Sequence, residues 1–283
     1  MKILAIMFLV LLATLFGLQA WRWSDNRRAV QVWQKLIRNH HEPRSAFEPA
    51  MVEGLPEPAR RYFLFTIKPG TVLSDVAEVE MGGSISLGTR EQPNAMPMRA
   101  QQILAAPRGF VWKLRAGQGA MHISGSDGIS ARQSWTRFWL FGTIPVVRAG
   151  GNSDHLRSAF GRVVAESVFF VPAALLPRDG ITWETVSDDV ARVTVFHDGM
   201  TQAVDVTVAE DGRPTMVVIN RWSNANPAKT YQLQPFGGYL SEFRDFGGYT
   251  LPTRVEGGNF IGTEEYFPFY KAEINNVRFI SRD

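Results

Sequence analysis

The chain of 283 residues contains no cysteine. This absence excludes disulfide bonds, thiol nucleophiles, iron–sulfur clusters and every zinc site that depends on cysteine ligands. It also excludes the lipid-modified cysteine that lipoproteins carry. It does not indicate a compartment, because cysteine-free chains occur on either side of a bacterial inner membrane.

Motifs that carry catalysis or bind cofactors are missing as well. There is no Gly-x-Ser-x-Gly nucleophile elbow, no P-loop and no Gly-x-Gly-x-x-Gly dinucleotide fingerprint. Five histidines are present, none at a spacing typical of metal ligands: His40, His41, His122, His155 and His197. We therefore predict no metal, no cofactor and no catalytic residue, and we expect that the protein is not an enzyme.

A strong excess of one charge is also lacking. Lysine and arginine number 30 and aspartate and glutamate 27, which leaves a net charge of +3, and the basic residues are scattered. Nucleic-acid-binding surfaces gather basic residues into a patch or stripe, so no nucleic-acid partner is predicted. An apolar fraction of 45% with 20% charged residues is typical of a folded globular chain.

The most informative feature that is present is an apolar run at residues 3–21. It carries no charge and extends about 28 Å as a helix, close to the thickness of the hydrocarbon core of a membrane. Residues 1–23 are predicted to form a transmembrane anchor or an uncleaved signal. A cleaved signal and a buried core helix are the alternatives. A cleaved signal is disfavoured because residues 18–20 match the Ala-x-Ala cleavage site poorly. A buried core helix is disfavoured because the run shows no polar face.

The anchor predicts a single-pass protein of the inner cell membrane with the membrane as a partner. Met1 and Lys2 before the apolar run are typical of an export signal, which favours a periplasmic domain. Arg22, Arg27 and Arg28 beyond the run favour the opposite orientation by the positive-inside rule. The sequence alone leaves the side of the membrane open.

The rest of the chain divides into a helical part and a β-rich part. Residues 24–70 are predicted as a linker with packing helices, because apolar residues recur there at helical spacing. Residues 71–283 are predicted as an antiparallel β domain, because apolar and polar residues alternate. The N-cap signal at residues 152–154 predicts one internal helix at about residues 153–170.

Turn signals divide the β domain into about ten to twelve strands. Asp-Gly or Gly-Gly pairs at residues 127–128, 198–199, 211–212 and 247–248 predict hairpin turns, and residues 190–222 read as a three-stranded meander. Strands and helices do not alternate, which disfavours a parallel sheet. The predicted fold class is mainly β, a large curved antiparallel sheet (open or half barrel) with one or two packed helices, preceded by an N-terminal transmembrane helix.

Five short segments, together with Arg157 and Glu166, resemble an uncharacterised bacterial family with a domain of unknown function and membrane-anchored members. The segments are GLPEP at 54–58, RYF at 61–63, APRGFVW at 106–112, PAALLP at 172–177 and FRDFGGYTLP at 243–252. The last segment is also similar, more weakly, to the half-barrels that carry lipoproteins or lipids across the periplasm. This second resemblance implies a curved sheet around an apolar cavity capped by a helix.

Six residues are candidates for ligand contacts: Trp112, Trp135, Trp139, Phe141, Arg157 and Glu166. Trp135, Trp139 and Phe141 are expected on one face of a strand whose other face is also apolar. This strand is therefore either buried on both faces or borders an apolar space. Arg157 and Glu166 are too far apart on the predicted helix to pair along one face. Aromatic core packing, and an ion pair of Glu166 with a strand residue such as Arg221, are the structural alternatives.

The function that this pattern favours is a membrane-anchored binding module that holds a lipid or another hydrophobic ligand in a β-sheet cavity. One alternative is an uncharacterised enzyme with a polar site around Arg157 and Glu166, with His155 as a further candidate. The other is a scaffold that binds partner proteins through an exposed sheet edge.

Overall fold

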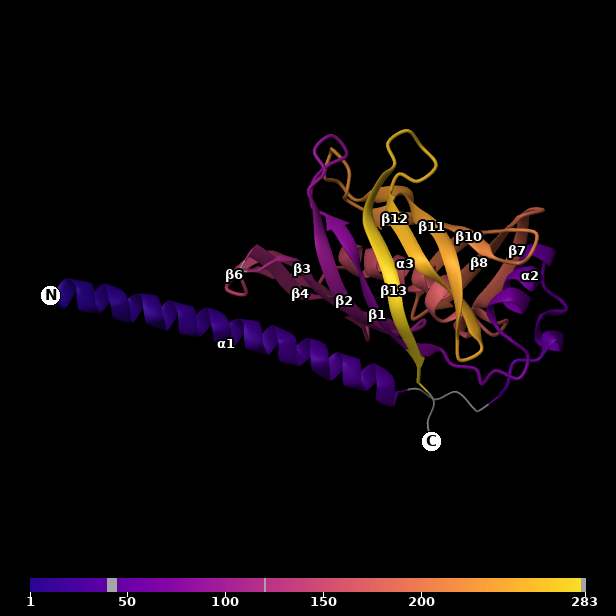
Figure 1. The fold of residues 1–283 in the computed structure, drawn as a ribbon, viewed down its shortest axis with the longest axis horizontal. Helices are drawn as coiled ribbons and strands as arrows, with labels where there is room; N and C mark the ends of the chain where they lie inside the picture. The colour runs from indigo at the N-terminus through magenta and orange to yellow at the C-terminus, as the bar shows by residue number, and fades with distance from the viewer. Residues whose placement is uncertain (40–44, 120, 281–283) are drawn as a thin grey trace.

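The computed structural model describes residues 1–39, 45–119 and 121–280. In these ranges the chain forms three α-helices, two short 3-10 helices and thirteen strands (Figure 1). The helical elements are α1 (Lys2–Arg38), η1 (Pro49–Val52), α2 (Glu57–Thr66), α3 (Ser153–Phe170) and η2 (Pro172–Leu175). The strands are β1 (Val76–Ser86), β2 (Ala95–Ala105), β3 (Gly109–Gln118), β4 (Met121–Ser130), β5 (Gln133–Leu140), β6 (Ile144–Gly150), β7 (Ile181–Ser187), β8 (Val190–His197), β9 (Met200–Val208), β10 (Pro214–Ser223), β11 (Gln232–Phe246), β12 (Tyr249–Asn259) and β13 (Phe267–Phe279).

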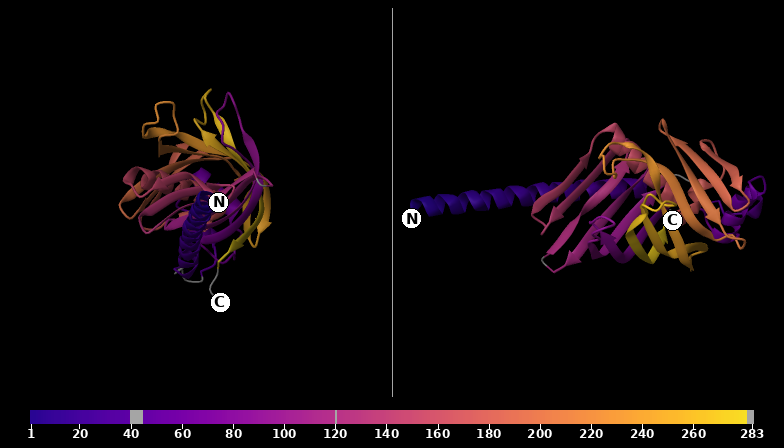
Figure 2. Two further views of the ribbon diagram at one scale, coloured as in Figure 1. Left: turned by 90° about the vertical axis from the view of Figure 1, so that its left-hand side faces the viewer. Right: turned by 90° about the horizontal axis from the view of Figure 1, so that it is seen from above.

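The strands of the described ranges form one antiparallel sheet, in the order β6-β5-β4-β3-β2-β1-β13-β12-β11-β10-β9-β8-β7. Two meanders, β1 to β6 and β7 to β13, join where β1 pairs with β13. The sheet is curved but not closed, because β6 and β7 lie at opposite edges (Figure 2). The predicted fold class is therefore confirmed.

The strand count and one turn differ from the prediction. The described ranges hold thirteen strands and not ten to twelve, and β5 and β6 are separated by only three residues, 141–143. Asp127 and Gly128 lie inside β4, so the turn predicted there is wrong. Gly128 pairs with Trp135 of β5, and a Cβ at Gly128 would lie 2.6 Å from the Trp135 ring. The glycine makes room for this ring and does not form a turn.

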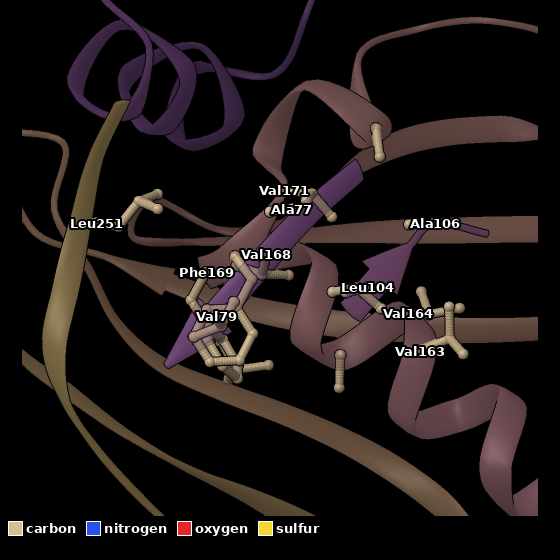
Figure 3. Close-up of a cluster of buried hydrophobic side chains, with 14 of the residues drawn as sticks. Ala77, Val79, Leu104, Ala106, Val163, Val164, Val168, Phe169, Val171 and Leu251 are labelled. Carbon is tan, nitrogen blue, oxygen red and sulfur yellow. The ribbon is translucent and has the colours of Figure 1, made fainter. Parts of the chain in front are cut away.

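Helix α3 covers the concave face and carries the chain from one sheet edge to the other. It follows β6 and leads through η2 to β7. Its N-terminus is capped by Asn152, whose side chain accepts a hydrogen bond from the backbone N–H of His155 at 2.8 Å. Val163, Val164 and Val168 of α3 belong to the same buried cluster as residues of β1 and β2 (Figure 3). This apolar packing holds α3 inside the sheet.

Alternate residues of one strand serve the two faces of the sheet. In β3, Phe110 and Trp112 belong to the main core under α3, whereas Val111 belongs to a second cluster on the convex face. That second cluster includes Ala29 and Leu36 of α1. The period of two along β3 therefore supports two different helices on opposite sides of the same strand.

Helix α1 is continuous from Lys2 to Arg38, and only its C-terminal half packs on the sheet. Residues 1–17 are all exposed. Among the described residues, α1 is the one helix that is long and apolar enough to cross a membrane. None of its apolar stretch is buried, so the alternative of a buried core helix is wrong. Asp25 fastens the packed half, because it pairs with Arg148 at 2.7 Å and with Arg137 at 3.4 Å.

Deleting a side chain between α3 and the sheet will test this packing. Phe160 of α3 is fully buried in the main core. We expect Phe160→Ala to lower the free energy of unfolding by about 3–5 kcal/mol, through lost burial and a cavity. The control Phe196→Ala removes an exposed ring of β8 and is expected to cost no more than about 0.5 kcal/mol. Urea unfolding of the detergent-solubilised chain measures both, and equal losses would contradict the packing.

Candidate functional site

A charged cluster lies between α3 and the concave face of the sheet. Arg162 of α3 pairs with Glu166, one turn further along α3, at 2.5 Å and with Asp127 of β4 at 2.6 Å. Gln102 of β2 donates a hydrogen bond to the second oxygen of Glu166 at 2.5 Å. The three charged side chains are only 15–19% exposed. Helix α3 is therefore tied to β4 by an ion pair and to β2 by a hydrogen bond, as well as by apolar packing.

The electrostatics of this cluster depend on balanced charges. Burial alone lowers the pKa of Arg162, but the nearby carboxylates of Glu166 and Asp127 outweigh it and raise the pKa above its ordinary value. For Arg221 of β10, the same two carboxylates compensate only in part. Burial and the positive charge of Arg162 lower its pKa to about 10. Two arginines and two carboxylates thus share a space that water reaches poorly.

Aromatic side chains surround the cluster. The Arg162 guanidinium lies 4.5 Å from the ring centroid of Phe110 and 5.0 Å from that of Trp112, which are cation–π distances. The indole Nε1 of Trp112 is buried and has no hydrogen-bond partner within the described residues. Tyr270 of β13 lies beside Trp112, and burial together with the charge of Glu166 raises its pKa. The cluster therefore combines ionic, aromatic and unpaired polar groups.

A small void of about 60 Å³ borders the cluster on the side of β10 to β13. Its polar lining includes Arg162, Glu166 and Tyr270. Its apolar lining includes Phe169, Phe236 and Leu240, and the strand backbone is bare where Gly237, Gly238 and Gly257 lie. A Cβ at Gly257 would have its nearest heavy-atom neighbour at 3.7 Å, so this glycine leaves space in the void. The void is thus lined by apolar side chains together with charged groups of the cluster.

His155 attaches the first turn of α3 to β5. Its Nδ1 lies 2.8 Å from Ser134 Oγ and its Nε2 lies 3.0 Å from Thr136 Oγ1. Thr136 also donates a hydrogen bond to Asp127 at 3.2 Å, so His155 is connected to the charged cluster. Burial lowers the pKa of His155, the charge of Asp127 opposes this and the charge of Arg221 adds to it.

The sequence matches the family of unknown function DUF6544 over residues 45–272, which is most of the chain. The chain belongs to this family. The predicted family resemblance is therefore confirmed, and no curated protein matches the sequence significantly.

Solved structures with distant similarity to this DUF6544 chain include a LolA superfamily protein from Nitrosomonas europaea. It has a TM-score of 0.41 and 13% identity and covers 80% of this chain and 92% of its own. An outer membrane lipoprotein-sorting protein domain from Vibrio parahaemolyticus has a TM-score of 0.35 and 12% identity, with coverages of 72% and 85%. A DUF1329 family protein from Desulfovibrio piger has a TM-score of 0.25 and 12% identity, with coverages of 73% and 86%.

Of the six residues predicted to contact a ligand, the structure brings two together on the concave face. Trp112 and Glu166 both contact the Arg162 side chain. Arg157 lies apart, stacked on the Trp222 ring at 4.5 Å, and is exposed. The ligand role of these residues stays a prediction.

The other three predicted residues lie elsewhere in the fold. Trp135 and Trp139 belong to β5 and face α1, where Trp139 donates a hydrogen bond to Asp25 at 3.3 Å. Trp135 also borders an open groove of about 700 Å³ beside the start of α3. The alternation predicts Phe141 on the strand, and this prediction is wrong. Phe141 lies in the β5–β6 turn with a φ of +53°. Strand β5 is thus buried on both faces, although its tryptophans contact α1 and not the void.

Sequence reasoning missed the central residue, Arg162. The partner of Glu166 is Arg162 and not Arg221, which instead donates hydrogen bonds to Ser158. A signal was available, because Arg162 and Glu166 have the four-residue spacing of a helical ion pair. Asp127 carried no usable signal, since an Asp-Gly pair is more typical of a turn.

The histidines and carboxylates of the described residues form no group of three that could hold a metal ion. Among the three histidines that the structure describes, His155 contacts the cluster region, through Thr136 and Ser134. His40 and His41 lie outside the described residues.

Removing the Arg162 charge will expose the dependence of the fold on the buried cluster. In Arg162→Met, the carboxylates of Asp127 and Glu166 lose their shared cation, and we expect a loss of about 3–5 kcal/mol in the free energy of unfolding. The matched control is Arg157→Met on the same helix, where the side chain is exposed, and the loss of its stacking on Trp222 is expected to cost no more than about 1 kcal/mol. Chemical denaturation measures both, and a tolerated Arg162→Met would show that the cluster is not structural.

Acid should weaken the attachment of α3 to β5. Because the pKa of His155 is lower in the folded chain than the ordinary value of about 6.5, the neutral ring stabilises the fold above that pH. This stabilisation is lost as the pH falls through the folded pKa. Between about pH 7.5 and about pH 5, the melting temperature of the wild-type chain should fall more than that of His155→Gln, which does not titrate. Parallel falls would contradict this role of His155.

Proposed function

We propose that this chain is a membrane-anchored binding module that holds a lipid or another hydrophobic ligand on the concave face, beneath α3. The observation that carries the proposal is the void between α3 and β10 to β13, whose lining combines apolar side chains with charged groups. An amphiphile matches both kinds of group, with an acyl chain for Phe169 and Leu240 and a polar group for Arg162 and Tyr270. In this proposal Trp112 and Glu166 belong to the site, whereas the other four predicted residues lie outside it.

The size of the void implies that α3 moves when ligand binds. The void of about 60 Å³ is less than half the volume of an engineered apolar cavity of about 150 Å³ that binds benzene. Helix α3 is connected to β6 through Gly151, whose φ of +73° suits glycine, and to η2 through Val171 and Pro172. Displacement of α3 between these connections would enlarge the void into a groove along the apolar core.

The anchor in this proposal is α1, which spans the inner membrane once and leaves the sheet in the periplasm. Its length and apolar character support the span. We propose no catalytic role. Arg157 lies apart from Glu166, so the polar site expected for the enzyme alternative is not assembled around these two residues.

Native mass spectrometry of the full chain, released from detergent micelles, tests the proposal. We expect part of the protein to carry an added mass that fragments as a lipid. Gly257→Leu should reduce this fraction several-fold, because the new side chain occupies the void.

The matched control is Gly54→Leu, at an exposed site with no atom within 4 Å of an added Cβ, which should leave the bound fraction unchanged. Lipid that merely surrounds α1 would be insensitive to both substitutions. A bare protein mass, or a lipid adduct unaffected by Gly257→Leu, would overturn binding beneath α3.

A further inference from the structure

The contacts of α1 show where this helix leaves the domain. Its buried and half-buried residues recur every three or four positions from Leu18 onward, through Arg22, Asp25 and Ala29. Every residue before Leu18 is exposed. The sheet therefore supports α1 only as far as Leu18, and residues 2–17 project beyond it (Figure 1).

This projecting part is too short to cross a bilayer alone. Residues 2–17 extend about 24 Å as a helix, whereas the hydrocarbon core is about 30 Å thick and needs about 20 residues. Tilting the helix shortens its reach along the membrane normal and increases the deficit. The apolar run, however, continues to Trp21. If α1 spans the membrane, the part of the domain that lies beside Gln19 to Arg22 must therefore enter the membrane interface.

The part of the domain at that level is the β5–β6 turn. Gln19 donates a hydrogen bond to the Gly142 carbonyl at 3.0 Å and another to Thr143 Oγ1 at 3.2 Å. Arg22 donates to the same Gly142 carbonyl at 3.0 Å. The turn is also joined to the β3–β4 end, because the Phe141 N–H donates to the His122 carbonyl at 2.9 Å. These contacts hold two hairpin ends against α1 where its apolar run ends.

Both hairpin ends expose large apolar side chains, which we call the apolar tip. Their exposed fractions are 42% for Phe141, 49% for Ile144, 45% for Val146 and 68% for Met121. Such a group costs free energy in water but gains it in the acyl-headgroup boundary of a membrane. In Figure 1 the end of β6 lies nearest to the projecting half of α1.

Aromatic and cationic side chains on α1 mark the same level. Trp21 at the end of the apolar run and Trp23 just beyond it are exposed, as expected for residues in the headgroup layer. Trp21 is also held to the sheet, with its ring edge-on to Trp139 at 5.5 Å and the Arg148 guanidinium 4.2 Å from its centroid. Since Arg148 also pairs with Asp25, this end of the sheet and α1 form one rigid contact.

We propose that the apolar tip inserts into the interface of the same bilayer that α1 spans, as a second membrane contact. The inference rests on the proposed membrane span of α1. Two contacts fixed to each other define the orientation of the domain, with the β6 edge and the start of α3 turned to the lipid surface. A ligand that enters beneath α3 would then pass between the membrane and the site without crossing the width of the sheet.

Spin labels on the full chain in phospholipid vesicles test this insertion. Because the chain lacks cysteine, each introduced cysteine is the only labelling position. The test positions are Ile144→Cys and Met121→Cys in the apolar tip, and both side chains are exposed, so substitution should not disturb folding. Leu9→Cys reports whether α1 spans the membrane, and Phe196→Cys, exposed on β8 near the opposite sheet edge, reports the aqueous phase.

Depth is read from the ratio of collision rates with oxygen, which dissolves in lipid, and with a water-soluble nickel chelate. We expect this ratio to be several-fold higher at residues 144 and 121 than at residue 196, and highest at residue 9. A lipid-exposed label at residue 9 with water-exposed labels at 144 and 121 would overturn the insertion and leave the anchor in place. Water-exposed labels at all four positions would overturn the anchor and the insertion together. Labels at 144 and 121 shielded from both collision agents would indicate a protein partner on the apolar tip and would also overturn the insertion.

Discussion

An open antiparallel sheet has a concave apolar face that must be covered, and in this protein α3 covers it while connecting the two sheet edges. The face is not purely apolar, because Asp127 and Gln102 point into it. Arg162 compensates for these groups and for Glu166 on its own helix. The position of α3, the shape of the void and the proposed site all depend on this one arginine and its carboxylates.

The same strands support a second helix on the other face. Strand β3 presents Trp112 to α3 and Val111 to α1, and β5 presents Phe138 to the core and Trp139 to α1. Helix α1 and the candidate site are thus separated by a single layer of sheet. The contact of α1 through Asp25 with β5 and the contact of α3 through Arg162 with β4 lie on opposite faces of one strand pair.

Local patterns predict the elements well, and the faces of these elements less well. Asn152 and the apolar spacing after it predict the helix at α3, and alternation with Asp-Gly turns predicts the β8 to β10 meander. Only part of the candidate site could be predicted from the sequence. The spacing of Arg162 and Glu166 is visible in the sequence, but their pairing with Asp127 and Gln102 joins residues 35 to 64 positions apart, which no local period reports. The Asp-Gly pair at 127–128 even suggests a turn. Gly128 is needed instead to leave space for Trp135 of the neighbouring strand, and this need becomes visible only when the two strands are paired.

The sequence by itself determined an apolar helix at the N-terminus, a mainly antiparallel β fold and membership of a family without established activity. These features follow from composition, from periods of two and 3.6 residues, and from motif order, all of which act within short segments. Only the tertiary structure decided which face each aromatic residue of β5 occupies, which cation neutralises Glu166, and which turn lies beside the end of the apolar run. Those outcomes depend on strand register and on helices that cross the sheet, and residues distant in the chain become neighbours only when the sheet has formed.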